Sequence, residues 1–193
     1  GRIGELLPAE RLIGSVVYPA AEIAAPGVIR HIEGNRFTLG ELDGAETPRV
    51  AALSQALTRA GFKAPVSSDI RSEIWMKLWG NATLNPVSAL TGATLEAMCR
   101  FPPTRALIAE MMAEVKAVAE AHGVRFRISI DKRIAGAEAV GAHKTSMLQD
   151  IEAGRAPEIE ALVGSVLEMG RIAGLACPRL EAAYAMVKLR ALA

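Results

Sequence analysis

The sequence predicts a mainly α-helical protein, in which a short αβ segment precedes an all-α domain. Two observations lead to this fold class. Up to residue 68, short β-rich runs and turns accompany a single helical stretch. From residue 69 onward, the apolar stretches have helical spacing, are rich in Ala, Leu, Ile and Met, and have Gly or Pro at or near their ends. With 193 residues, the chain can form one good core, or a small domain plus part of another.

The first third contains three candidate strands. Residues 11–18 are a continuous β-rich run, which is typical of a buried strand. Residues 28–32 and 36–39 are two further short strands, and the turn-forming residues 33–35 between them predict that these two pair as a hairpin. Three strands are too few to close a sheet of their own.

A helix is predicted over residues 48–60. Pro48 stands at its start, where a missing N–H costs nothing, and Gly61 stands just past its end, where positive φ is favoured. Residues 62–66 follow as a short extended link.

The central helix is predicted over residues 70–90. Its apolar side chains recur at helical spacing, and Asp69 is the candidate N-cap, with Glu73 in the first turns. The apolar residues are Ile70, Ile74, Trp75, Leu78 and Trp79.

Three polar side chains, Lys77, Asn81 and Asn85, follow one another at intervals of four along this helix. Four residues advance about 40° past a full turn, so the three form one slowly winding stripe about 12 Å long. An ammonium followed by two amides suits a small polyoxygenated anion. The alternative is a solvated helix face. Binding gains weight because Asn is a poor helix residue and large apolar side chains flank the stripe.

Six further helical segments complete the all-α domain. They cover residues 94–100, 103–122, 128–140, 147–153, 159–173 and 178–192. Gly or Pro punctuates them, as Gly123 and Gly174 do where they stop the second and the fifth.

Polar residues stand at two of these helix starts. Ser146 precedes an apolar-periodic segment and has Gln149 three residues later, which predicts a capping box. Glu158 opens the next helix, where the helix dipole favours a carboxylate. Capping alone explains both residues. Helix starts also gather anions, so Ser146 and Glu158 are candidates for a binding site as well.

Composition and charge argue against several classes of function. The net charge is +1 without a Lys/Arg run, and aromatic residues are 4%, so nothing indicates a nucleic-acid partner. No apolar run approaches the roughly 20 residues of a membrane span, and a cytoplasmic protein is expected. Cys99 and Cys177 are expected as buried thiols, and the histidines lack metal-site spacing. Neither GxGxxG nor GxSxG occurs.

Two motifs of this chain resemble the ketopantoate reductases, that is, the 2-dehydropantoate 2-reductases. The first is IWMKLWGNATLNP at residues 74–86, and the second is SMLQDIEAGRAPEIE at residues 146–160. The run VVYPAAE at residues 16–22, the predicted hairpin and the turn at residues 174–178 extend the likeness over essentially the whole chain.

The resemblance implies an NADPH-dependent oxidoreductase that reduces the 2-keto acid ketopantoate to pantoate, on the route to pantothenate. It implies that residues 1–67 end a Rossmann-type nucleotide-binding domain. It further implies that residues 68–193 form an all-α substrate-binding and dimerisation domain like the C-terminal domain of 6-phosphogluconate dehydrogenase. Because the dinucleotide fingerprint is missing, most of the NADPH site is expected outside this chain, and the chain alone is expected to be inactive.

The resemblance also assigns roles to five residues. Lys77 matches the family's catalytic lysine, and an ammonium there can stabilise the oxyanion that hydride delivery creates and then donate its proton. Asn81, Asn85 and Ser146 match its substrate-binding residues and can hold the hydroxyl and carboxylate ends. Glu158 matches its glutamate, which can orient Lys77, bind the substrate hydroxyl or contact the cofactor.

Two alternatives stay open. His143 stands three residues before Ser146, where relatives can carry a different polar group, so a reductase of another 2-keto or 3-keto acid is the nearest rival. From a different class, the chain is a non-catalytic helical interaction domain. In that case Trp75, Met76 and Trp79 form an interface and the polar stripe is merely solvated.

Overall fold

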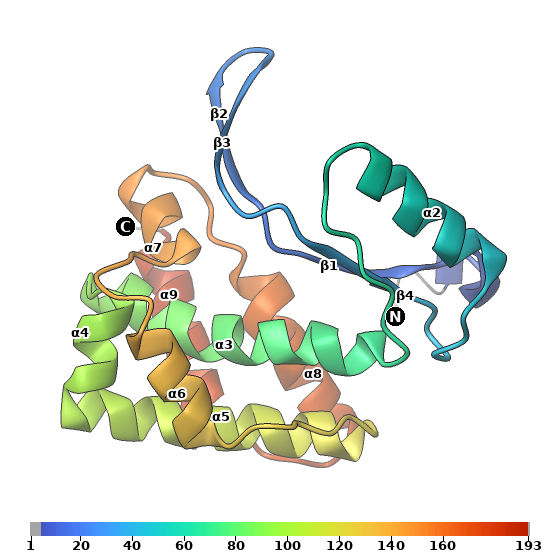
Figure 1. Cartoon of the computed structure of the whole chain (residues 1–193). Coiled ribbons are helices and arrows are strands. Elements are labelled where there is room, and N and C mark those ends of the chain that lie inside the picture. The colour runs from blue at the N-terminus through green and yellow to red at the C-terminus, as the bar shows by residue number, and fades with distance from the viewer. Residues whose placement is uncertain (1–4, 193) are drawn as a thin grey trace. The chain divides into compact units, whose positions relative to one another are not determined.

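The computed structural model describes residues 5–192, and the chain divides into two compact units, Gly1–Ile74 and Trp75–Ala193 (Figure 1). The predicted fold class is confirmed. Among the described residues, the strands β1 to β4 lie in the first unit, and the second unit is built from helices. The boundary falls in the first turns of helix α3 (Ile70–Thr91).

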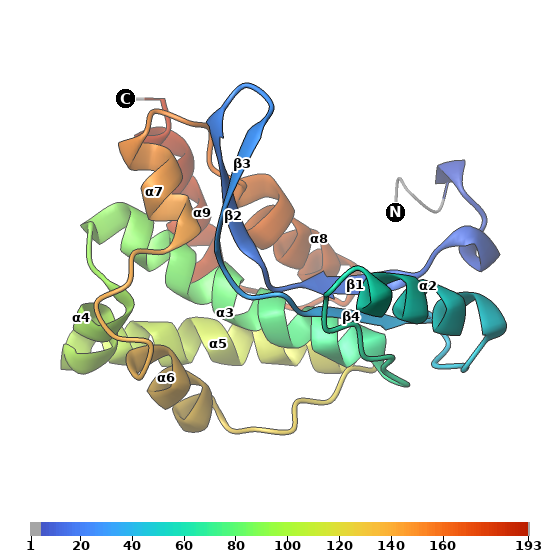
Figure 2. The same cartoon turned by 45° about the horizontal axis from the view of Figure 1, so that its top comes forward.

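The four strands form two separate antiparallel pairs. β1 (Gly14–Val17) pairs with β4 (Phe37–Gly40), and β2 (Ala20–Ala25) pairs with β3 (Val28–Glu33). Figure 2 shows the second pair as a two-stranded ribbon. The strand predicted over residues 11–18 is β1, which is shorter than expected. Its predicted first residue, Arg11, belongs instead to the 3-10 turn η1 (Ala9–Arg11).

The predicted hairpin of residues 28–32 with 36–39 is wrong. β3 pairs with β2 across a turn that contains Gly27, whose φ is +77°, and β4 returns to β1. Gly34 separates β3 from β4 at φ +74°, and a Cβ there would lie 2.9 Å from the carbonyl oxygen of Tyr18. The Ala-rich β2 escaped prediction because Ala has low strand propensity, so its only local signal was weak.

Helix α2 (Pro48–Arg59) follows the predicted pattern. The Thr47 side chain caps it by accepting from the Val50 amide, and Gly61 past its end has a φ of +93°. The extended link after the helix joins β4, because the Phe37 amide donates to the Lys63 carbonyl at 2.8 Å. The small core of this unit comprises Leu39, Val50 and Ala64.

Helix α3 begins as predicted, with the Asp69 carboxylate accepting from the Ser72 amide at 3.2 Å. Trp79 is fully buried, and its indole N–H donates at 2.8 Å to the Met112 carbonyl on α5 (Pro102–Ala121). Ile74, predicted on the apolar face, is 37% exposed instead. Further along α3, residues 82–89 are all buried, so the helical unit covers this part of the helix on every side.

Helix α5 contacts four of the remaining helices, α4, α6, α8 and α9 (Figures 1 and 2). The segment predicted as one helix over residues 159–173 begins with a π-helical turn, η2, and continues as α8. Cys99 and Cys177 are buried free thiols, as predicted. No helix within residues 5–192 is long and apolar enough to cross a bilayer. The bounds are α4 Leu95–Arg100, α6 Ile130–Glu138, α7 Ser146–Glu152, η2 Glu160–Gly164, α8 Ser165–Ile172 and α9 Pro178–Arg190.

Candidate substrate-binding and catalytic site

Helix α3 carries Lys77, Asn81 and Asn85 on one winding face, as its geometry requires. Lys77 and Asn81 are half-buried and Asn85 is buried. Another buried polar residue of this helix, Thr83, satisfies its hydroxyl by donating to a backbone carbonyl one turn back, at 2.8 Å. Among the described residues, the amides of Asn81 and Asn85 make no such bond, so their hydrogen-bonding groups are available to a ligand.

Lys77 and Glu158 lie far apart in the sequence, yet the charge of Glu158 acts on Lys77. Burial lowers the pKa of Lys77, and the negative charge of Glu158 opposes this by raising it. Glu158 is exposed and lies just before the helical segment that opens at Ile159, rather than inside its first turn. The structure therefore places a half-buried ammonium within the field of a carboxylate.

The predicted capping box at Ser146 is wrong by one residue. Thr145 is the N-cap of α7, because its hydroxyl accepts from the Leu148 amide at 3.3 Å. The Gln149 side chain reaches back to the Lys144 carbonyl at 3.0 Å. Ser146 is the first helical residue and is exposed, so its hydroxyl is not needed for capping.

The structure thus brings some of the five predicted residues together. Lys77 and Glu158 interact, and Asn81 and Asn85 share the helix of Lys77. Ser146 starts α7, and the loop after this helix leads directly to Glu158. Within the part of the chain that the structure describes, no hydrogen bond joins Ser146 to α3.

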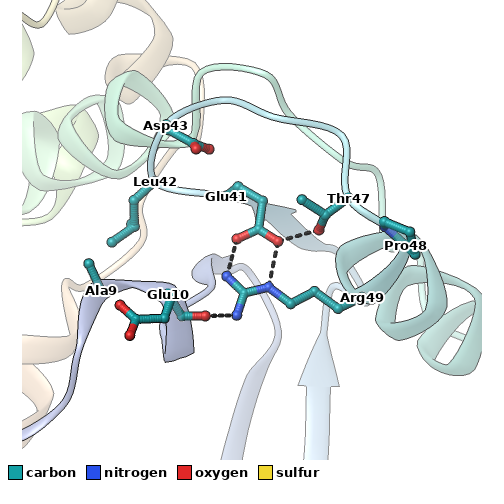
Figure 3. Close-up of a pocket in the computed structure, with 8 residues that line it drawn as sticks. All are labelled: Ala9, Glu10, Glu41, Leu42, Asp43, Thr47, Pro48 and Arg49. Carbon is teal, nitrogen blue, oxygen red and sulfur yellow. Dashed lines mark hydrogen bonds and ion pairs between the residues drawn. The ribbon is translucent and has the colours of Figure 1, made fainter.

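The N-terminal unit contains a cavity of about 780 Å³, which is lined by none of these five residues (Figure 3). In its wall, the carboxylate of the buried Glu41 accepts hydrogen bonds from the Arg49 guanidinium and the Thr47 hydroxyl. The Arg49 hydrogen bond is the main reason that the pKa of Glu41 falls to about 2. A carboxylate so firmly ionised is a structural anchor and not a proton donor. Sequence reasoning missed the pair because Glu41 follows β4 and Arg49 lies in the first turn of α2, so the period of a single element does not relate them.

The side chains of the five predicted site residues fit a small organic acid better than a metal ion or a dinucleotide. The described residues contain no group of three His, Cys, Asp or Glu side chains that could hold a metal. They also contain no glycine-rich turn that leads from a strand into a helix, which is the arrangement that cradles a dinucleotide pyrophosphate.

Comparison with known proteins assigns the family. The model of the ketopantoate reductase PanE/ApbA C-terminal domain matches residues 69–191. The chain belongs to the ketopantoate reductase family. It is 54% identical over 188 residues to a 2-dehydropantoate 2-reductase of Mesorhizobium japonicum, and the match covers 97% of this chain and 58% of that protein. The resemblance carried by the two sequence motifs is confirmed.

Solved structures agree with this family. The structure of a 2-dehydropantoate 2-reductase from Methylococcus capsulatus is 31% identical in sequence and superposes with a TM-score of 0.88. The match covers 99% of this chain and 66% of that one. A D-mandelate dehydrogenase solved with NADH and anilino(oxo)acetate shares the fold at 22% identity and a TM-score of 0.83, over 98% of this chain and 63% of that one. The chain thus spans about three fifths of the Mesorhizobium ketopantoate reductase.

Proposed function

We propose that the complete protein reduces ketopantoate to pantoate with NADPH, in pantothenate biosynthesis, and that this chain is its substrate half. One observation carries the proposal. Within the ketopantoate reductase domain, a half-buried ammonium at Lys77 lies in the field of Glu158, on the helix that presents the amides of Asn81 and Asn85.

These residues divide the work in the proposed reaction. Asn81, Asn85 and Ser146 hold the hydroxyl and carboxylate ends of the keto acid and so orient its carbonyl. When bound, the reduced nicotinamide supplies the hydride. Lys77 stabilises the negative charge that develops on the carbonyl oxygen and then gives that oxygen its proton. Glu158 counteracts the effect of burial and keeps Lys77 protonated until that step.

The remaining parts of the proposal concern the whole protein. We assign residues 1–67 to the end of a Rossmann domain and residues 68–193 to substrate binding and dimerisation, and we place the enzyme in the cytoplasm. Most of the NADPH site then lies outside this chain, with Glu158 as the one predicted residue able to reach it. NADPH and NADH oxidation by the complete enzyme, compared at equal concentration, tests the cofactor preference. Sedimentation velocity tests the homodimer.

Lys77→Ala in the complete enzyme tests the assignment. We expect kcat with ketopantoate to fall about 10²–10³-fold, because an oxyanion-stabilising donor is removed. Lys116→Ala is the matched control. Lys116 is also a partly exposed helical lysine of this unit, and it pairs only at the surface with Glu120, at 3.6 Å. Near-normal turnover of Lys77→Ala, at a rate equal to that of the control, would refute the assignment.

A reductase of a different keto acid is the second candidate. His143 is exposed three residues before Ser146, where it can select the substrate tail without altering the keto-acid core. A panel of 2-keto and 3-keto acids, ranked by kcat/KM, separates the two candidates. The interaction-domain alternative loses its main support, because Trp75 and Trp79 are 8% and 0% exposed inside the core of their own unit.

A further inference from the structure

We infer that Glu160, Tyr184 and Lys188 form a clamp that positions Glu158 beside Lys77. This inference rests on the proposed function of the site, because it concerns how the carboxylate of Glu158 is held. The three residues are positioning residues and not catalytic residues. None of them belongs to the five that the sequence motifs pointed to.

The clamp joins the segment after Glu158 to helix α9. The Tyr184 hydroxyl lies 2.7 and 2.6 Å from the two carboxylate oxygens of Glu160. The Lys188 ammonium donates to the same carboxylate at 2.7 Å and to the Tyr184 hydroxyl at 3.2 Å. The ammonium also lies 5.1 Å from the centre of the Tyr184 ring. These contacts lower the pKa of Glu160 and raise that of Lys188.

Glu160 is also where the backbone changes its winding. It opens the π-helical turn η2, and the Ser165 amide donates to its carbonyl, five residues back. Glu158, two residues earlier, is joined to the same segment by its backbone, because its carbonyl accepts from the Leu162 amide at 3.1 Å. Such π turns often occur at functional sites. A side chain anchored at the first residue of this turn restrains the backbone of the residues just before it, which include Glu158.

The exposure of the clamp indicates what it does. The side chains of Glu160 and Lys188 are 64% and 50% exposed, and exposed ion pairs add little to stability. The Tyr184 ring, in contrast, packs against the hydrophobic core of the unit and makes a firm anchor. Glu158 lies two residues before Glu160; it is exposed and has no hydrogen bond from its side chain to a described residue. Its position therefore depends on the backbone that the clamp holds.

Gly164 offers an independent position at which a substitution can disturb the clamp. A Cβ at this helical position would lie 2.9 Å from a Glu160 carboxylate oxygen and 3.5 Å from the Tyr184 ring. Gly164→Ala should thus displace the carboxylate while raising helix propensity. Gly136 on α6 is the matched control, because a Cβ there meets nothing within 4 Å.

The pKa of Lys77 in the complete enzyme tests the clamp. It is measured by NMR titration of labelled lysine, and the Lys77→Arg variant assigns the signal. Glu158 is the charged group that acts on Lys77, so its displacement should lower the pKa of Lys77 further. We expect Glu160→Gln, Tyr184→Phe and Gly164→Ala to lower it in the same direction as Glu158→Gln. Adding Glu160→Gln to Glu158→Gln should change it no more. Gly136→Ala and Lys188→Arg should leave it unchanged.

Turnover gives the second readout. We expect kcat to fall about ten- to a hundredfold in Glu160→Gln and Gly164→Ala, with a smaller change in KM, because Glu158 is misplaced and the asparagines are not. An unchanged pKa of Lys77 in all three clamp variants would overturn the inference. If the pKa shifts as expected but no keto acid is reduced by the unsubstituted enzyme, the clamp stands and the proposed function fails.

Discussion

At the scale of single residues, burial dominates the pKa shift of the half-buried Lys77, whereas hydrogen bonds dominate that of the buried Glu41. Burial lowers the pKa of Lys77, and the opposing charge of Glu158 limits the change. Glu41 is also buried, but its hydrogen bonds to Arg49 and Thr47 outweigh burial and hold its pKa at about 2. A group whose pKa is shifted towards easier proton release is a candidate for catalysis, whereas a carboxylate held in its charged form serves the fold.

The Glu41 pair predicts acid-sensitive stability. The folded-state pKa of about 2 lies below the ordinary 4.5, so the stabilisation is complete above about pH 4.5 and is lost as the pH falls towards 2. Arg49→Ala should lower stability at pH 7 and flatten this acid dependence. Hydrogen exchange of peptides from β4 and α2, measured between pH 7 and 3, checks both effects.

Arg30→Ala is the control for this experiment. It breaks the exposed 2.9 Å pair with Glu22 in the β2–β3 ribbon, and a pair at such an exposed site adds little. Equal loss of protection in the two variants would contradict the structural role of Glu41.

At the scale of elements, helix starts are held by residues that the local sequence does not reveal. Helix α9 begins at Pro178 with no side-chain cap from its own N-cap residue, Cys177. Glu114 on α5 supplies the cap instead, because its two carboxylate oxygens accept from the Arg179 and Leu180 amides, both at 2.9 Å. One carboxylate thereby fixes α9 to α5 and satisfies two amides of its first turn.

Glu114→Ala should destabilise the first turn of α9 by about 1–3 kcal/mol, because two charge-assisted hydrogen bonds are lost. Faster hydrogen exchange of the Arg179 and Leu180 amides would show this directly. Glu110→Ala is the matched control one turn earlier on α5, because Glu110 binds only the Arg179 side chain, at 2.6 Å. If the control loosens these amides as much, Glu114 is not the cap.

At the scale of the molecule, the helical unit closes around side chains from distant parts of the chain. Cys99 and Cys177 both lie in this core, and burial raises the pKa of each thiol. A thiol that is buried and protonated reacts slowly.

We therefore expect both cysteines to resist a thiol reagent in the native complete protein and to react together when denaturant opens the helical unit. Mass spectrometry of the peptides that contain Cys99 and Cys177 measures the two rates. Rapid labelling of either cysteine without denaturant would show that this core opens locally.

Much of the helical architecture followed from local sequence. Asp69, Gly123 and Gly174 mark helix ends because capping oxygens and positive φ act within one turn. The stripe of Lys77, Asn81 and Asn85 follows from helical pitch alone. The two motifs were also sufficient to identify the ketopantoate reductase family.

The tertiary structure alone decided which strands pair and that Thr145 and not Ser146 caps α7. Strand alternation specifies a face but not a partner, so an adjacent strand is only the default choice. Likewise, spacing cannot report the distance between residues that separate helices carry, because the packing of those helices determines it. The clamp at Glu160 belongs to the same class, since α9 reaches it only in the folded protein.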